Sequence, residues 1–301
     1  MMRPIDMHII ERGIKIADSK MFEEDKIWSH YSNDKVDVGE ELAMVIRTIF
    51  KAFPLRKAIS ALSIGSSNEP QFRLLQSSFR DGLYLLDVEK EALDIVQERI
   101  HRQHIKHVKT IPCDYSKIFF NPEKTALLLK TKLEGKKMNL ITLHHSLYYC
   151  RKSNWNALFE NLYRHILAPN GAIHTVLMAA ESNECHTTTW LYNHFVGKYF
   201  GHRNDQELRK FKKELQANPL FSKAQILMRW HRVHFFVNDF EKFMSAIWMI
   251  LLYPEVHQYS LKQREEITEF IYKKFWKVKR PLVQLQDHLV IYRGIGFKGL
   301  I

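Results

Sequence analysis

The sequence predicts an α/β fold: a Rossmann-like, seven-stranded, mostly parallel sheet with an antiparallel last hairpin and helices on both faces. Two observations carry this prediction. From residue 37 to residue 178, short and almost continuously apolar strand segments alternate with amphipathic helical segments, as in a parallel sheet covered on both faces. Later in the chain, longer strand segments flank further helices, which favours an antiparallel pair at the sheet edge.

The predicted elements follow one another in a regular order. A helix begins at Asp37 and ends before Pro54, because apolar side chains from Leu42 to Phe53 recur at helical spacing. Residues 168–171, Ala-Pro-Asn-Gly, predict a turn before the fifth strand. The predicted strands are 58–64, 83–88, 107–111, 138–143, 172–178, 224–237 and 287–292, and the main helices between them are 71–77, 125–133, 239–252 and 261–278.

The composition is that of a globular protein with a substantial core. The chain has 301 residues, of which 46% are hydrophobic and 26% charged, and this excludes a disordered or collagen-like chain. No linker or repeat marks an internal boundary. We therefore expect a single domain over residues 1–301. Residues 1–41 would form an N-terminal helical cover segment, and 181–223 and 239–286 would be additions on the substrate side.

The net charge of +12 first suggests a nucleic-acid partner. Residues 1–41, however, hold six Lys and Arg against ten Asp and Glu, and the basic excess is spread over the rest of the chain without a basic tail. A nucleic-acid partner thus stays possible but is not favoured, and the sequence leaves the oligomeric state open. The more informative charge is the local negative charge of the N-terminal segment.

The cysteines and the apolar runs bear on location and metal binding. Cys113, Cys150 and Cys185 are too few and too widely spaced for a disulfide framework or a zinc site, and no histidine set completes a metal site. No signal peptide is visible at the N-terminus, and the longest apolar run is too short to span a bilayer. We expect a cytoplasmic protein without a membrane or metal partner.

Three features stand at the carboxyl ends of successive predicted strands, where open α/β sheets bind their ligands. A tight turn of small residues follows the first strand at Gly65 and lets backbone N–H groups approach a ligand closely. Asp87 ends the second strand, where a carboxylate can accept both hydroxyls of a ribose. Asp114 follows the third, within reach of an adenine amino group. Together they predict a nucleoside-containing ligand.

With these residues, the sequence resembles the class I S-adenosylmethionine-dependent methyltransferases. Residues 62–69, Leu-Ser-Ile-Gly-Ser-Ser-Asn-Glu, resemble the glycine-rich first motif, and residues 143–149, Leu-His-His-Ser-Leu-Tyr-Tyr, resemble the motif after strand four. The resemblance covers residues 40–180 well and implies S-adenosylmethionine as cofactor. The positions that it implies for cofactor binding are Gly65, Ser66, Ser67, Glu69, Asp87, Val88, Asp114, Tyr115 and His144.

Within the class, the layout is most similar to the histamine N-methyltransferase group, which shares Leu-Ser-Ile-Gly and the Leu-Tyr-Tyr after strand four. The resemblance places the acceptor contacts on Asp34, His145, Tyr148, Tyr149, Trp190 and Asp287. At two of them, His145 and Asp287, the histamine enzymes carry an amide. Of the glycines of the first motif, only Gly65 is present. We expect a small acceptor that bears an amine or an aromatic ring.

These residue types suit methyl transfer, which is an in-line displacement at a sulfonium. Positioning supplies much of the catalysis, and aromatic faces suit the cationic sulfonium or an amine. Asp34 and Asp287 are suited to bind an ammonium, and His145 to accept a proton. His145 and Tyr148 are therefore the predicted catalytic residues. One of the two neighbouring tyrosines is expected to pack under the following helix.

Two other functions remain open at the level of sequence. The first is methylation of RNA or protein, which the diffuse basic charge permits, although no Asn/Asp-Pro-Pro-Tyr/Phe motif and no appended RNA module are present. The second is a non-catalytic binding protein on a methyltransferase fold, which the loss of glycines after Gly65 suggests.

Overall fold

The computed structural model describes residues 4–18, 21–54, 57–65, 69–252 and 258–296. The chain forms two compact units. Unit 1 comprises Met1–Asp37, Met178–Glu207 and Trp230–Gln286, and unit 2 comprises Val38–Leu177, Leu208–Arg229 and Asp287–Ile301. Most of the predicted N-terminal cover and late-chain additions fall in unit 1. Among the described residues, every helix is too short or too polar to pass through a bilayer.

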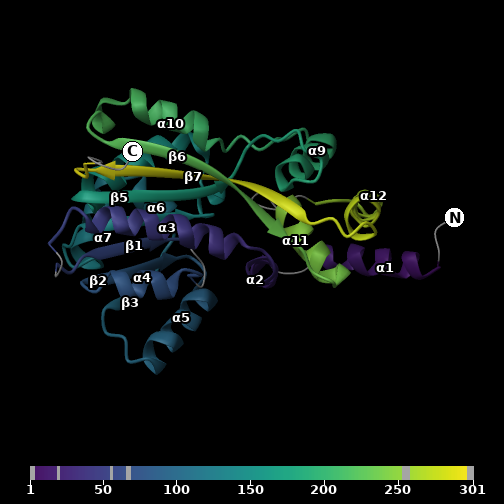
Figure 1. The fold of residues 1–301 in the computed structure, drawn as a ribbon, viewed down its shortest axis with the longest axis horizontal. Coiled ribbons are helices and arrows are strands. Elements are labelled where there is room, and N and C mark those ends of the chain that lie inside the picture. Colours follow the sequence, from purple (N-terminus) through teal and green to yellow (C-terminus); the bar gives the residue numbers. More distant parts are fainter. Residues whose placement is uncertain (1–3, 19–20, 55–56, 66–68, 253–257, 297–301) are drawn as a thin grey trace. The chain divides into compact units, whose positions relative to one another are not determined.

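A seven-stranded sheet with the order β3-β2-β1-β4-β5-β7-β6 confirms the predicted fold class (Figure 1). The five strands from β3 to β5 in this order are paired in parallel, and the last two form the antiparallel pair at the edge. The strands are β1 (Ser60–Ile64), β2 (Gly82–Asp87), β3 (Val108–Pro112), β4 (Met138–His144), β5 (Leu167–Met178), β6 (Gln225–Phe235) and β7 (Leu282–Arg293).

Helices connect most of these strands, as the alternation in the sequence predicts. In unit 2 they are α3 (Asp34–Phe50, whose first turn belongs to unit 1), α4 (Phe72–Ser78), α5 (Lys90–Arg102), α6 (Ser116–Phe119), α7 (Pro122–Thr131), α8 (Trp155–Asn161) and α10 (Leu208–Ala217). In unit 1 they are α1 (Pro4–Lys15), α2 (Met21–Tyr31), α9 (Thr188–Phe200), α11 (Phe240–Leu252) and α12 (Leu261–Ile271).

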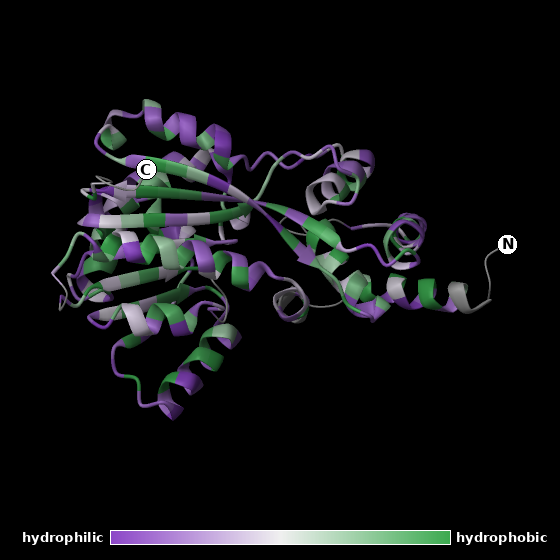
Figure 2. Ribbon diagram, in the orientation of Figure 1, coloured by the Kyte–Doolittle hydropathy of each residue, from purple (hydrophilic) through white to green (hydrophobic). Residues whose placement is uncertain are grey.

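The strands of unit 2 are apolar on both sides because helices cover both faces of the sheet. On one face, Leu62 and Leu143 belong to a buried cluster with side chains of α6, α7, α8 and α10. On the other face, Ala61 and Leu140 belong to a cluster with side chains of α3, α4 and α5. In Figure 2 the strands of unit 2 show green bands between white and purple ones, whereas α10 is mostly purple. Successive side chains of a strand therefore pack into the clusters on opposite faces of the sheet.

The start of β5 differs from the prediction. Residues 168–171, expected as a turn, lie inside the strand, because Leu167 already pairs with Met138 of β4. The register then shifts, and Ala172 pairs with Leu140. A Cβ on Gly171 would lie only 2.8 Å from the carbonyl oxygen of Asn139. The turn-forming sequence is thus an irregularity within a paired strand, which single-sequence turn signals do not distinguish from a free turn.

Unit 1 has a hydrophobic core of its own. Its buried cluster is built mainly from α9, α11 and α12, with Trp28 of α2 and Ile10 of α1. Trp248 of α11 is fully buried, and its Nε1 donates a hydrogen bond to the carbonyl oxygen of Gly13 at 3.0 Å. The N-terminal helices are therefore tied into this core rather than being separate from it.

Candidate active site

The turn after β1 requires glycine at its first position. Gly65 has φ +65°, and a Cβ there would lie 2.6 Å from the Cβ of Ser146, which follows β4. The N–H of Gly65 donates to the carbonyl oxygen of Leu86 at 2.7 Å. The turn after β1 and the segment after β4 are thus in close contact. The predicted cofactor residues Ser66 and Ser67 lie outside the described residues.

Glu69 is a buried carboxylate within the same turn. Its side chain is 2% exposed, its φ is 52°, and it accepts a hydrogen bond from the hydroxyl of Ser63. Its Oε1 also accepts a hydrogen bond from the N–H of Gln71 at 3.1 Å. Because a buried carboxylate is stable only with such donors, Glu69 holds both ends of the turn together.

Asp87 stands at the carboxyl end of β2, beside this turn. Ile64 pairs with Leu86, so the residues that follow, Gly65 and Asp87, are neighbours at the edge of the sheet. Asp87 is 8% exposed, and its Oδ1 accepts a hydrogen bond from the N–H of Glu89 at 2.8 Å. The next predicted cofactor residue, Val88, is 73% exposed.

Asp114 and Tyr115 follow β3 and have different environments. Oδ1 of Asp114 accepts hydrogen bonds from the N–H and the hydroxyl of Ser116, at 3.0 and 2.6 Å. Partial burial raises the pKa of Asp114, but these bonds and the nearby Lys117 outweigh it, so the pKa lies below its usual value. Tyr115 is buried, and its hydroxyl donates to the carbonyl oxygen of Ser146 at 2.8 Å. Burial raises the pKa of Tyr115 well above its usual value.

The segment after β4 begins with a strained histidine. His145 has φ 53°, a conformation unusual for a non-glycine residue, and its N–H donates to the carbonyl oxygen of Val176 on β5 at 2.9 Å. Its ring stacks on that of Tyr148 with centroids 6.0 Å apart, and its Nδ1 lies 3.4 Å from the Tyr148 hydroxyl. Tyr148 packs against the core, as expected for one of the pair, while Tyr149 is 51% exposed.

His144 ends β4 and is 8% exposed. Its Nε2 lies 3.1 Å from Nδ1 of His174 on β5, and Nε2 of His174 lies 3.3 Å from Nδ1 of His288 on β7. Sequence reasoning did not single out His174 or His288. In the sequence, each of these histidines is a polar residue inside a strand segment that is otherwise mostly apolar.

Asp287 lies on β7 with its carboxylate against a guanidinium. It is 2% exposed, and Nε and Nη2 of Arg209 donate to its Oδ1 at 3.2 and 2.9 Å. Nε also lies 3.2 Å from Oδ2. Arg209, on α10, is a partner that the sequence did not reveal. The predicted ammonium site on Asp287 therefore coincides with a carboxylate that already holds a cation.

Two predicted acceptor residues belong to unit 1. Asp34 opens α3 and is half-buried, and its N–H donates to the hydroxyl of Ser32 at 3.2 Å. Trp190, on α9, stacks on His194 with centroids 4.4 Å apart and an interplanar angle of 11°. Both rings line a cavity of about 820 Å³. The polar and charged residues that share its lining are Glu181, Ser182, Asn183, Asn193, Lys198, Arg203 and Asn204.

Within unit 2, the contacts thus bring Gly65, Asp87, Tyr115 and His145 to the carboxyl edge of β1, β2, β3 and β4. The absence of a side chain at Gly65 lets Ser146 approach the turn after β1, and Asp87 beside Gly65 offers a carboxylate. These residues lie where open α/β sheets bind their ligands, and the segment after β4 lies next to them.

Comparison with known proteins places the fold. No family model matches the chain, and its sequence matches no curated protein. Among solved structures, the YcgJ protein of Bacillus subtilis is similar over 83% of this chain and 99% of its own, with 11% identity and a TM-score of 0.52. A Bacillus halodurans protein provisionally named a methyltransferase matches the same shares, with 12% identity and a TM-score of 0.51.

The fold is that of the methyltransferases. Open α/β sheets bind their ligands outside the carboxyl ends of the strands, and in this chain those ends bear Gly65 and Asp87. At 11–12% identity the similarity supports the fold alone. The reaction and the acceptor depend on the residues of the site.

Proposed function

We propose that this chain is an S-adenosylmethionine-dependent methyltransferase that acts on a small acceptor bearing an amine or an aromatic ring. The observation that carries the proposal is that Gly65 and Asp87 directly follow the paired residues Ile64 and Leu86 at the carboxyl edge of a sheet with the methyltransferase fold. A backbone without a side chain and a carboxylate stand side by side there. S-adenosylmethionine, when bound, supplies a methyl group on a sulfonium sulfur.

Each residue of the edge has a defined part in the proposed site. Asp87 accepts hydrogen bonds from ribose hydroxyls, and Glu69 ties Ser63 of β1 to Gln71 at the start of α4. Asp114, whose Oδ1 also accepts hydrogen bonds from Ser116, accepts a hydrogen bond from the adenine amino group. Its low pKa keeps the carboxylate an acceptor throughout the neutral range.

His145 is the proposed base of the site. Methylation of a protonated amine or a hydroxyl releases one proton, which an imidazole can accept near neutral pH. The strained backbone at φ 53° and the stacked Tyr148 hold the ring in one place. Such strain is typical of residues whose position matters for chemistry.

Trp190 is the proposed aromatic wall for the acceptor. An indole face attracts an ammonium or stacks on a ring, and the cavity beside it also offers the carboxylate of Glu181. Asp287 is a weaker candidate for the amine contact, because an ammonium would have to replace Arg209 on its carboxylate. Asp34 and Tyr149 remain proposed acceptor contacts.

The first test is calorimetry with S-adenosylmethionine and S-adenosylhomocysteine. The Asp87→Ala variant should lose roughly 10–100-fold in affinity, because hydrogen bonds to a charged group contribute about 1.5–3 kcal/mol each. Asp94→Ala, which changes an exposed carboxylate on α5, is the matched control and should bind like the parent protein. Equal affinity of the Asp87→Ala variant and the parent would refute the assigned site.

The second test identifies the acceptor class with methyl-labelled S-adenosylmethionine. Label should pass to histamine or to a simple phenol, used as probes, and Trp190→Ala should raise the KM for the amine while leaving the cofactor affinity unchanged. Trp230→Ala, at a tryptophan that is 59% exposed, is the control. Transfer to RNA with a steep salt dependence would favour the nucleic-acid alternative. Failure to bind either form of the cofactor would favour a non-catalytic protein.

A further inference from the structure

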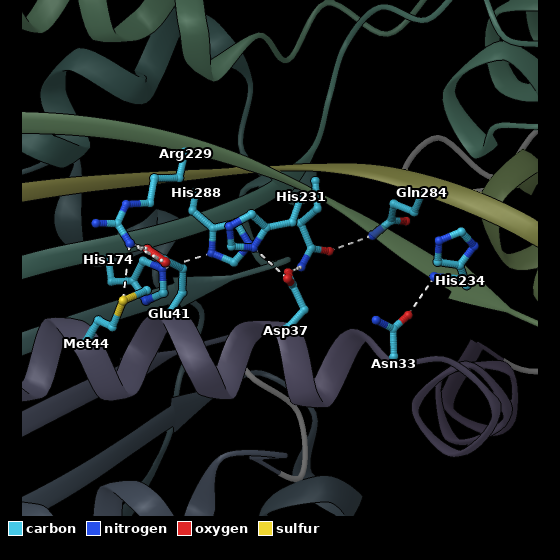
Figure 3. Close-up of polar contacts among 11 residues, drawn as sticks. Asn33, Asp37, Glu41, Met44, His174, Arg229, His231, His234, Gln284 and His288 are labelled. Carbon is cyan, nitrogen blue, oxygen red and sulfur yellow. Dashed lines mark hydrogen bonds and ion pairs between the residues drawn. The ribbon is translucent and has the colours of Figure 1, made fainter.

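Three buried histidines form a continuous row across three neighbouring strands. His144 on β4 lies against His174 on β5, which lies against His288 on β7, with ring nitrogens 3.1 and 3.3 Å apart. His174 and His288 are 0% exposed and His144 is 8% exposed. The rings of His174 and His288 stack at 5.5 Å, and Figure 3 shows the contact between them.

The register of the sheet puts the row on one face. His144 pairs with Val176 and Thr142 pairs with His174, so the two histidines lie on the same side of the sheet. Leu140, Ala172 and Val290 have the same alternation and belong to the cluster under α3, α4 and α5. The row is therefore on the α3 face, whereas Asp287 and Arg209 are on the opposite face with α10.

The two neighbours of His174 restrict which ring nitrogens in the row can carry a proton. Both of its ring nitrogens lie within hydrogen-bonding distance of another ring nitrogen, one at each side. Burial, and then the neighbouring imidazoles of His144 and His288, lower the pKa of His174 well below its usual value, so its ring is neutral. A neutral imidazole has one donor and one acceptor nitrogen. His174 must therefore donate to one neighbour and accept from the other.

Two proton arrangements satisfy this condition when all three rings are neutral. In the first, Nε2–H of His144 donates to His174, and Nε2–H of His174 donates to His288, which leaves Nδ1 of His144 as an acceptor. In the second, both hydrogen bonds run the other way, and Nδ1 of His144 carries the proton. No ring can change its tautomer alone, because doing so would place two lone pairs or two protons face to face.

We propose that His174 and His288 are positioning residues that restrict the tautomer of His144, because the three rings can change their tautomers only together. This inference rests on the proposed function, because it needs a ligand at the carboxyl end of β4. It extends that function by linking the site to two residues that lie one and two strands away in the sheet.

The test is nuclear magnetic resonance of protein labelled with 15N in its histidine rings, with and without S-adenosylhomocysteine. In the parent protein, His144 and His174 should each show one protonated and one unprotonated nitrogen. In His288→Leu, the row loses one end, and both nitrogen signals of His144 should shift although residue 288 lies two strands away from residue 144 in the sheet. His288→Gln, whose amide can donate or accept, should give an intermediate shift.

Controls separate this coupling from a loss of structure. Thr175→Val changes the next residue of β5, whose side chain faces the other side of the sheet, and should leave all three histidines unchanged. Far-ultraviolet circular dichroism identifies variants that fail to fold, and for those the His288→Gln variant carries the test. Unchanged His144 signals in a folded His288 variant would overturn the proposal.

The measurements with S-adenosylhomocysteine distinguish the positioning role from the proposed function. Binding of S-adenosylhomocysteine should shift the ring signals of His144, and through the row those of His174. Binding without any change at His144 would refute the positioning role and leave the proposed function standing. Absence of binding in calorimetry would refute the proposed function itself.

Discussion

The Cβ of Ser146 occupies the space into which a side chain at residue 65 would project, at a separation of only 2.6 Å from an ideal Cβ on Gly65. This relationship ties the turn after β1 to the segment after β4, although the two residues are far apart in sequence. It is a close steric constraint on the described part of the candidate site.

Replacing Gly65 by alanine should both destabilise the protein and weaken cofactor binding. A positive φ costs a residue with a Cβ about 1–2 kcal/mol, and the contact with Ser146 adds a further overpacking cost of roughly 1–3 kcal/mol. We expect a lower free energy of unfolding in urea and weaker binding of S-adenosylhomocysteine. Gly135→Ala is the matched control, since Gly135 has φ +72° but no atom within 4 Å of its ideal Cβ. Equal losses in both variants would show that strain alone is at work.

The hydroxyl of Tyr115 should contribute to the geometry of the same segment. Its hydrogen bond to the Ser146 carbonyl oxygen is buried, so Tyr115→Phe should cost about 1 kcal/mol of stability. Because Ser146 lies against Gly65, the variant should also bind S-adenosylhomocysteine more weakly than its stability loss alone suggests. Thermal unfolding and calorimetry measure the two effects separately. Unaltered affinity would mean that Ser146 keeps its place without this bond.

The pair of Asp287 and Arg209 should respond unequally to loss of either partner. Arg209→Ala leaves a 2% exposed carboxylate without its cation and should cost roughly 3–5 kcal/mol, whereas Asp287→Asn leaves a half-exposed guanidinium that water can solvate and should cost less. Urea unfolding measures both. Arg232→Ala, which breaks an exposed ion pair with Glu184, is the control and should cost less than about 1 kcal/mol. The reverse order of the two main variants would contradict the proposed burial effect.

Asp114 should make an acid-dependent contribution to stability. Its pKa is lower in the folded chain than in the unfolded one, so the ionised carboxylate stabilises the fold above its unfolded pKa, and this contribution disappears as the pH falls through the folded pKa. In Ser116→Ala the carboxylate loses its hydroxyl donor, and the pKa of Asp114 should rise toward its usual value. A titration of the carboxyl 13C signal measures this. An unchanged midpoint would show that the backbone N–H of Ser116, together with the side chain of Lys117, is enough to keep the pKa of Asp114 low.

Much of the carboxyl edge of the sheet can be predicted from the sequence because it is built from local signals. An apolar strand followed by Gly65, and another followed by Asp87, are patterns within a few residues, and parallel pairing then brings their ends together. The antiparallel edge pair was also expected, from the long strands late in the chain, but the order of the strands was not predicted. The turn expected at 168–171 was wrong as a free turn, because pairing with Met138 draws those residues into β5.

The sequence by itself determined the fold class, the apolar strands and the residues at their carboxyl ends, since these depend on periodicity and on the order of elements. Only the tertiary structure decided the partners of the buried polar groups. Arg209 meets Asp287 across 78 positions, and His174 meets His288 across 114, on opposite faces of one sheet. A buried charge or imidazole must find a partner to offset the loss of water, but which residue supplies it depends on packing between distant elements, which no local pattern encodes.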